Sequence, residues 1–471
     1  MVFRSALLHT CFAVLIVNSV GAAAPPNIIL VMADDMGWGQ TGYYDHPVLQ
    51  TPNLDAMAAG GLRFDRFYAG APNCSPTRAT VMTGRTNDRT GVLNHGVPLR
   101  PQERTIAQAL QQAGYATGHF GKWHLNGLRG VGAPILKDDI RGPGRFGFNT
   151  WLSVTNFFDR DPLMSRMGVF EEFKGDSSEI IVDQAMDFVR QQTAAGRPFF
   201  AVVWYGTPHS PFIAIDEDKQ DFSELDRASA NHYGELVAMD RSIGTLRSGL
   251  RKLNIADSTF LWFCSDNGGL PKIKPATVGG LRGFKNSVYE GGLRVPAIIE
   301  WPNGISKPRI THYPSCTMDI FPTLVDVVGL SKPSAAVPLD GLSLKPLFSK
   351  ELSHREHPIG FRHTNRTAFL DNRYKLINTK VGSDRFELYN LESDPTETNN
   401  IIDQQPQIAS RLKSAWSKWN DSIEASITGK DYPENEVIPA DPGPATWTEV
   451  EAYRPYLSEW KKRPEYRSRI K

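Results

Sequence analysis

The chain has 471 residues, of which 40% are hydrophobic and 22% are charged, and its formal net charge is +1. This composition is typical of a folded globular protein with enough apolar residues for a large core. The small net charge, without long runs of like charge in the sequence, argues against a nucleic-acid-binding protein. At roughly 150 residues per domain, the length predicts two or three domains.

The first 24 residues have the pattern of a signal peptide. Arg4 supplies a positive charge, residues 6–17 are largely apolar, and small residues at 21–24 precede Pro25. The apolar run is short for a membrane-spanning helix, so we expect cleavage rather than an anchor. The mature protein is therefore predicted to be secreted or periplasmic, without stable insertion in a membrane.

The sequence contains four cysteines, namely Cys11, Cys74, Cys264 and Cys316. Cleavage of the signal peptide would remove Cys11 and leave three. Three is an odd number for an exported protein, so the count predicts at least one unpaired thiol. Cys264 and Cys316 could form a disulfide, or both could be buried as small apolar residues. The sequence leaves both arrangements open.

Short apolar runs that alternate with helical patterns predict an α/β fold. The apolar runs that are typical of buried parallel strands are residues 28–32, 199–205 and 260–264, and the short segment 116–120 is interpreted as a further strand. The segments with helical spacing or helix-end signals are residues 77–83, 105–113, 179–195 and 229–253. This order predicts a large, mostly parallel central sheet flanked by helices.

The pattern changes after about residue 355. Short antiparallel strands are predicted within residues 369–378 and 386–390, and an amphipathic helix is predicted over residues 402–424. These features indicate a smaller C-terminal α+β subdomain. The predicted division of the chain is a signal peptide at 1–24, a large α/β domain at 25–355, the α+β subdomain at 356–425 and an extended C-terminal tail at 426–471.

Polar side chains follow each of the predicted parallel strands directly. They are Asp34 and Asp35 after the first strand, Lys122 and His124 after the second, His209 after the third, and Asp266 and Asn267 after the fourth. Because the carboxyl ends of parallel strands lie on one edge of a sheet, we expect these side chains to converge. Their repeated placement is a stronger signal than any one cluster.

Several of these side chains offer hard oxygen donors. Asp34, Asp35, Asp266 and Asn267 suit calcium or magnesium better than zinc, which prefers nitrogen and sulfur. Calcium is favoured because an all-protein cage suits it better than magnesium. A single such Asp is more often a helix cap or a turn residue, but four donors at two strand ends favour a metal.

Cys74 directly precedes the predicted helix at residues 77–83. The positive end of a helix dipole is expected to lower the pKa of a thiol there and to favour an anionic ligand. Arg78 adds a bidentate donor for an oxyanion such as sulfate or phosphate. These residues alone fit two interpretations about equally well: a reactive cysteine in an anion-binding site, and a buried cysteine beside an ordinary helix cap.

The segment Cys74–Arg78, which continues to Arg85, resembles the signature of the type I, formylglycine-dependent sulfatases. Residues 114–124 resemble the second signature of that family. Other similar segments follow in the order of the family, namely residues 34–39, 51–55, 208–212, 265–268, 281–285, 289–296 and 387–391. The resemblance therefore covers nearly the whole mature chain, and it is closest to the arylsulfatase and N-acetylgalactosamine-6-sulfatase branch.

The resemblance implies an alkaline-phosphatase-like fold and a sulfuric ester hydrolase that acts on a sulfated carbohydrate or an aryl sulfate. It also implies one calcium ion and a formylglycine (3-oxoalanine) made from Cys74 by a formylglycine-generating enzyme. The implied metal ligands are Asp34, Asp35, Cys74 in its modified form, Asp266 and Asn267. The implied catalytic residues are Cys74, Arg78, Lys122, His124, His209 and Lys285.

The resemblance also implies a role for each catalytic residue. One hydroxyl of the hydrated formylglycine would attack sulfur, and the other would later expel the sulfate. Lys122 would bridge the diol and a sulfate oxygen, and Asp266 could accept the diol proton. His209 and Lys285 would hold sulfate and protonate the leaving alcohol, because an alkoxide is a poor leaving group. His124 would take the proton that releases sulfate.

Two other functions fit part of the pattern. One is a phosphatase or phosphonate hydrolase of the same superfamily, although many of those use two zinc ions and a serine or threonine nucleophile. The other is a sulfoglycan-binding protein with an unmodified Cys74, which would not need both histidines and both lysines. Trp151, Phe157 and Phe158 could contact a sugar or lie in the core. The substrate and the oligomeric state remain open.

Overall fold

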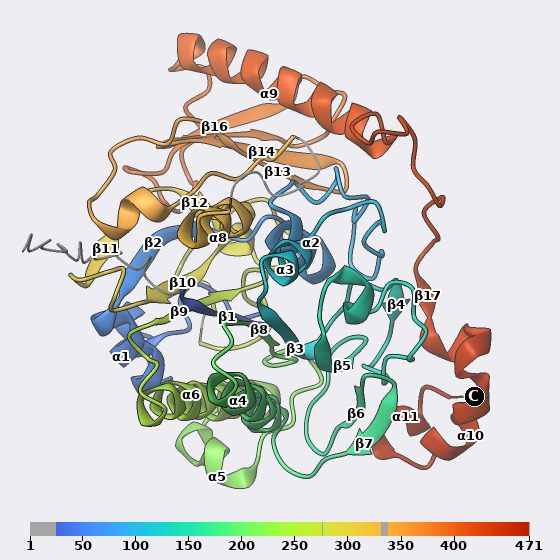
Figure 1. The fold of residues 1–471 in the computed structure, drawn as a ribbon. Coiled ribbons are helices and arrows are strands. Elements are labelled where there is room, and N and C mark those ends of the chain that lie inside the picture. The colour runs from blue at the N-terminus through green and yellow to red at the C-terminus, as the bar shows by residue number, and fades with distance from the viewer. Residues whose placement is uncertain (1–24, 276, 331–337, 471) are drawn as a thin grey trace, which may run out of the picture.

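A computed structural model describes residues 25–275, 277–330 and 338–470. The predicted signal peptide, with Cys11, lies outside these residues. The centre of the molecule is one large sheet with helices on both faces, and a second sheet lies at one side (Figure 1). This architecture confirms the predicted fold class.

Within the described residues the large sheet has 11 strands in the order β11-β2-β10-β9-β1-β8-β3-β5-β6-β7, and β12 pairs with β2. The five neighbours β9, β1, β8, β3 and β5 run parallel, and β10 runs antiparallel to β9. The strands are β1 (Asn27–Ala33), β2 (Leu62–Tyr68), β3 (Ala116–Lys122), β5 (Thr150–Val154), β6 (Leu163–Arg166), β7 (Val169–Glu172), β8 (Phe199–Trp204), β9 (Thr259–Ser265), β10 (Arg294–Glu300), β11 (Arg309–Thr311) and β12 (Ser315–Cys316).

Two helical layers cover the two faces of this sheet (Figure 1). The helices of one layer are α1 (Pro52–Gly60), α4 (Ser177–Ala194) and α6 (Arg227–Lys252), and those of the other are α2 (Cys74–Thr83), α3 (Ile106–Gln112) and α8 (Ile320–Val328). Alternate residues of β1 enter the two cores, with Leu30 on one side and Val31 on the other. A strand buried on both faces needs the continuous apolar sequence that predicted it. None of the helices in the described ranges is both long and apolar enough to cross a membrane.

Helix α2 begins at Cys74, three residues before the predicted start at Thr77. Pro76 is compatible with this start because the first turn of a helix does not use its backbone N–H groups. The helix ends at Gly84, whose φ of 70° is a left-handed conformation that glycine adopts without strain. Cys74 is therefore part of the helix N-terminus rather than of the preceding loop.

The second sheet is antiparallel, with the order β13-β14-β15-β16, and α9 packs on one face of it. Its elements are β13 (Ile359–His363), β14 (Arg366–Asp371), β15 (Tyr374–Asn378), β16 (Phe386–Asn390) and α9 (Pro406–Ile427). The region predicted as strand at 369–378 is a hairpin that turns at Asn372, which has a φ of 55°. These elements form the predicted C-terminal subdomain, whereas the boundaries at residues 355 and 425 stay predictions.

The C-terminal segment differs from the extended tail that the sequence predicts. After α9 the chain runs down one side of the molecule and folds into β17 (Ala445–Thr446), α10 (Leu457–Trp460) and α11 (Pro464–Arg467) (Figure 1). Strand β17 pairs with β4 (Leu128–Arg129). The aromatic residues of this segment that are buried together are Trp447, Tyr453, Trp460 and Tyr466. Burial of their large apolar area explains why the segment folds.

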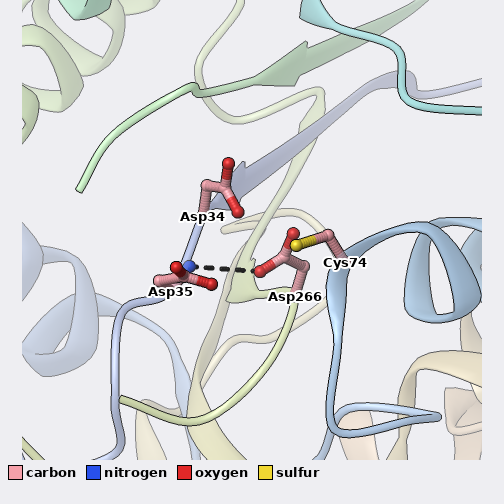
Figure 2. A group of neighbouring side chains, drawn as sticks. All are labelled: Asp34, Asp35, Cys74 and Asp266. Carbon is pink, nitrogen blue, oxygen red and sulfur yellow. Dashed lines mark hydrogen bonds between the residues drawn. The ribbon is translucent and has the colours of Figure 1, made fainter. Parts of the chain in front are cut away.

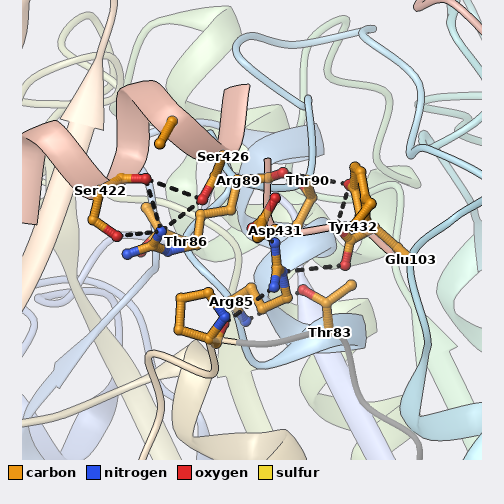
Figure 3. Close-up of polar contacts among 12 residues, drawn as sticks. Thr83, Arg85, Thr86, Arg89, Thr90, Glu103, Ser422, Ser426, Asp431 and Tyr432 are labelled. Atoms are coloured by element: carbon orange, nitrogen blue, oxygen red, sulfur yellow. Dashed lines mark hydrogen bonds and ion pairs between the residues drawn. The ribbon is translucent and has the colours of Figure 1, made fainter. Parts of the chain in front are cut away.

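Buried polar contacts join the end of α9 to the segment that follows α2 (Figure 3). Arg85 pairs with Glu103, with Nε 3.3 Å from Oε2, and with Asp431. Tyr432 donates a hydrogen bond from its hydroxyl to Glu103 Oε1 at 2.5 Å. Arg89 donates to the Ser426 hydroxyl at 2.7 Å. The C-terminal part of the chain is thus anchored by arginines of the large domain.

The cysteines of the described residues, Cys74, Cys264 and Cys316, are all buried and form no disulfide with one another. Cys264 lies in β9 and Cys316 in β12. The alternative in which both are buried as small apolar residues is therefore the one that the structure supports.

Candidate active site

Four side chains converge at the carboxyl edge of the parallel strands (Figure 2). Asp34 and Asp35 follow β1, Asp266 follows β9, and Cys74 is the first residue of α2. One ligand atom of each lies within 4.8 Å of the others, and all four residues are buried. The structure thus brings together donors from three segments that are far apart in the sequence.

Asn267 joins this group and leaves an oxygen free. Its Nδ2 donates a hydrogen bond to Asp35 Oδ1 at 2.8 Å. Its own Oδ1, like Oδ1 of Asp34, is buried without a hydrogen-bond partner in the described part of the chain. Unpartnered buried acceptors are destabilising, so both oxygens are available to bind a cation beside the carboxylates. Asp35 has a φ of 72°, a strained conformation that often accompanies functional sites.

Three cationic side chains surround the carboxylates. Arg78 Nη2 lies 2.7 Å from Asp266 Oδ2, and Lys122 Nζ lies 2.5 Å from Asp34 Oδ2. Lys285 Nζ lies 2.6 Å from Asp35 Oδ1, and its side chain is 14% exposed. The Arg78 and Lys122 side chains are fully buried, so neither is a solvated surface cation. Ammonium and guanidinium groups at this depth need such partners.

The surroundings shift the pKa values of Asp34 and Asp266 in opposite directions. Burial opposes the ionisation of Asp34, yet Lys122 and the other nearby cations lower its pKa below the usual range. Burial and the neighbouring charge of Asp34 raise the pKa of Asp266 to about 7, against the opposing effect of Arg78. A carboxyl with that pKa can accept or release a proton near neutral pH. Burial and the charge of Asp34 thus act together to favour the protonated form of Asp266.

Cys74 differs from the expectation for a thiol at a helix N-terminus. Its burial raises the pKa of the thiol to about 12, although Lys122 and Lys285 act in the opposite direction. The predicted direction of this pKa shift is therefore wrong, because loss of solvation raises the pKa more than the nearby lysines lower it. The thiol stays protonated at neutral pH, so it is a weak nucleophile in this form.

Of the two predicted histidines, His209 lies beside a carboxylate, and His124 is close enough for Asp34 and Lys122 to influence its pKa. His209 Nε2 is 3.8 Å from Asp35 Oδ2, and burial together with Lys285 lowers the pKa of His209 to about 4. His124 has a φ of 56°, and both of its ring nitrogens are buried without a hydrogen-bond partner within the described ranges. Burial and the charge of Lys122 hold the pKa of His124 well below its usual value. Both rings are therefore neutral at pH 7 and can accept a proton.

Two aromatic residues support the site, and sequence reasoning did not assign them this role. Phe157 stacks on His209, with ring centroids 4.6 Å apart and planes at 11°. The guanidinium of Arg78 lies 5.0 Å from the ring centroid of Trp204, the last residue of β8. Trp204 stands at a strand end next to the predicted cluster, a signal that could have identified it. For Phe157 the sequence suggested only a sugar contact or a position in the core.

Sequence similarity extends over the whole region that carries the site. Residues 26–330, which include all the converging side chains, match the sequence profile of the sulfatase family. This chain belongs to the sulfatase family. Residues 282–422 match the profile described as N-sulphoglucosamine sulphohydrolase, C-terminal, which begins within the segment that carries Lys285. The family that the sequence predicted is therefore confirmed.

Curated relatives support the same assignment. N-acetylgalactosamine-6-sulfatase of Canis lupus familiaris is 34% identical over 365 residues, which cover 70% of this chain and 67% of that protein. Arylsulfatase A of Homo sapiens is 33% identical over 369 residues, which cover 70% of this chain and 68% of that protein. This chain spans 66% of the length of N-acetylgalactosamine-6-sulfatase of Homo sapiens. The matched part is thus about two thirds of these relatives.

Solved structures share the fold. The crystal structure of Ps i-CgsB in complex with k-i-k-neocarrahexaose aligns with a TM-score of 0.76 at 25% identity, over 95% of this chain and 100% of that chain. Phosphonate monoester hydrolase of Agrobacterium radiobacter aligns with a TM-score of 0.62 at 20% identity, over 85% of this chain and 96% of that chain. The second likeness concerns the fold alone.

Proposed function

We propose that this chain removes sulfate from a sulfated carbohydrate or an aryl sulfate. The observation that carries the proposal is the position of Cys74, at the N-terminus of α2 and beside Asp34, Asp35 and Asp266. Relatives named N-acetylgalactosamine-6-sulfatase and arylsulfatase A support this class of substrate. The N-terminal sequence pattern supports export of the protein to a secreted or periplasmic location.

The donor set fits a calcium ion. Asp34, Asp35, Asp266, Asn267 and residue 74 would hold it, and the unpartnered oxygens of Asp34 and Asn267 supply hard ligands. When bound, the ion would lower the free energy needed to ionise a nucleophile and to build negative charge on the sulfuryl oxygens. It would also offset the repulsion among three buried carboxylates.

The proposed nucleophile is a formylglycine that a formylglycine-generating enzyme makes from Cys74. The high pKa of the unmodified thiol supports a different nucleophile at this position. Once hydrated, the aldehyde would supply one hydroxyl to attack sulfur and a second to release the sulfate.

The surrounding side chains would bind sulfate and move protons. Lys122 and Lys285 would hold the sulfate oxygens. Both form ion pairs with carboxylates of the cluster, which keeps their ammonium groups next to residue 74. Asp266 would accept the proton of the nucleophile. The charge of a bound sulfate would favour the protonated form of His209, which could then protonate the leaving alcohol. His124, with both nitrogens unpartnered in the described residues, would accept the proton during sulfate release.

Parallel assays test this function against the phosphatase alternative. We expect the purified protein to hydrolyse p-nitrophenyl sulfate faster than p-nitrophenyl phosphate. A clear preference for phosphate would reject the proposal in favour of a phosphatase. Mass spectrometry of the peptide that contains Cys74 tests the modification, since conversion replaces one sulfur and two hydrogens with one oxygen. A wholly unmodified and inactive protein would instead support a binding function.

A further inference from the structure

Lys285 lies on a loop that touches two parts of the candidate site. Its backbone N–H donates to Gly269 O at 3.0 Å, on the segment that follows Asp266. The next residue, Asn286, has a φ of 70° and donates from its N–H to Pro72 O at 2.8 Å. Pro72 lies just before Cys74. The conformation of this loop therefore determines the position of the Lys285 ammonium group relative to the site.

The loop leads into the short helix α7 (Glu290–Leu293), which packs backbone against backbone on Gly268. Gly268 donates from its N–H to Gly292 O at 3.0 Å. A Cβ at Gly268 would clash with Gly291 O, so only glycine allows this approach. Gly268 follows the donor Asn267 directly. The position of α7 is thus coupled to the site on this side as well.

A fully buried ion group holds α7 from the C-terminal sheet. Lys375 of β15 places Nζ 2.9 Å from Glu290 Oε1 and 2.9 Å from Glu397 Oε1. Glu397 Oε2 accepts a hydrogen bond from the Glu290 backbone N–H at 2.6 Å. All three side chains are inaccessible to solvent. One lysine of the subdomain therefore connects both acids that fix the start of α7.

A second contact holds the other end of the loop. Arg282 donates from Nη1 to Glu397 O at 2.7 Å and to the Tyr389 hydroxyl at 3.0 Å. Its guanidinium lies 3.9 Å from the ring centroid of Tyr289. Both ends of the Lys285 loop are therefore attached to the same C-terminal sheet.

Charges buried this completely often add little stability compared with apolar residues of similar size, and in some proteins they specify the geometry instead. A lysine side chain is flexible, so the direction of the Lys285 ammonium depends on its backbone. We propose that Lys375 is a positioning residue, which acts through Glu290 and Glu397 to fix the loop that presents Lys285 to the sulfate. This inference rests on the proposed function, because it takes Lys285 as a sulfate-binding residue.

A double-mutant cycle tests the proposal with p-nitrophenyl sulfate as substrate and inorganic sulfate as inhibitor. We expect Lys375→Met to lower kcat/KM and to weaken sulfate inhibition, each about tenfold. In the Lys285→Ala background the same substitution should change both quantities less than about twofold, because the residue it positions is gone. Equal losses in both backgrounds would overturn the proposal.

The controls separate positioning from general damage. Lys413→Met removes a lysine of the same subdomain whose Nζ lies 2.8 Å from the exposed Asp384, and it should leave kcat/KM unchanged. If circular dichroism shows that Lys375→Met does not fold, Glu397→Gln replaces it in the double-mutant cycle with Lys285→Ala. Wild-type protein that hydrolyses no sulfate ester would reject the proposed function and this inference together. Active wild type with additive losses would reject the inference alone.

Discussion

The two ends of helix α2 bury charged side chains in different ways. At its N-terminus, oxygens of Asp34 and Asn267 and both ring nitrogens of His124 have no hydrogen-bond partner in the described residues. Beyond its C-terminus, Arg85 forms ion pairs with Glu103 and Asp431, although Arg85 Nε and Glu103 Oε2 also lack a hydrogen-bond partner in the described residues. Buried charge is common to both ends, so it does not by itself mark a functional site.

Backbone conformation distinguishes the two ends of α2. Asp35 and His124 adopt positive φ angles of 72° and 56° at the N-terminal end of α2. At the other end the positive φ falls on Gly84, which adopts it without strain. Strained non-glycine residues beside unpartnered polar atoms indicate a site that is organised for a ligand. The contrast predicts that mutations at the first end change activity and mutations at the second end change stability.

The largest expected effect is that of Cys74→Ala. The substitution removes the precursor of the proposed nucleophile, so we expect kcat to fall at least about a thousandfold. Tm should fall less than on calcium removal, because four of the proposed calcium ligands, Asp34, Asp35, Asp266 and Asn267, remain. An equally active variant would contradict the nucleophile and, with it, the functional role of this end of the helix.

Calcium removal should affect the same end through both activity and stability. We expect EGTA to abolish hydrolysis of p-nitrophenyl sulfate and to lower Tm, and added calcium to restore both. A ligand at 100 times its Kd stabilises the folded state by about 2.7 kcal/mol. Differential scanning fluorimetry with EGTA, calcium and magnesium measures this effect independently of catalysis. An unchanged Tm in EGTA would count against a calcium ion in this cluster.

Arg85→Met tests the other end of α2. It leaves Glu103 buried without its cation, so we expect a loss of about 3 kcal/mol in the free energy of unfolding. The value of kcat/KM, corrected for the folded fraction, should not change. Urea unfolding and kinetics on the same preparation give both numbers. A variant that keeps its stability but loses activity would show that this end of α2 serves catalysis rather than stability.

Phe157→Leu is expected to have the smallest effect. It removes the ring that stacks on His209, and such aromatic contacts contribute about 1 kcal/mol. We expect kcat/KM to fall about fivefold because His209 is held less firmly. Phe386→Leu is the matched control, since Phe386 contacts Trp416 in the C-terminal subdomain instead. Equal kinetic effects of the two substitutions would show that the stacking on His209 has no special role.

Much of the candidate site follows from local sequence patterns. Apolar runs identify buried strands, and polar residues directly after those runs must lie at one edge of a parallel sheet. These patterns alone predict that Asp34, Asp35 and Asp266 lie together, and the geometry agrees. The predicted start of α2 is less accurate because Pro76 obscures the first turn.

Other features depend on residues that are distant in the chain. The pKa of Cys74 is raised mainly by burial, and burial depends on what packs around the thiol. Lys375 and Glu290 pair across 85 positions of sequence, and the aromatic residues of the C-terminal segment fold because β4 and β6 offer a surface to cover. The sequence alone determined the order of elements and the chemistry at the strand ends, since both arise from short-range patterns. Desolvation and long-range pairing were decided only by the tertiary structure, because they depend on which surfaces meet.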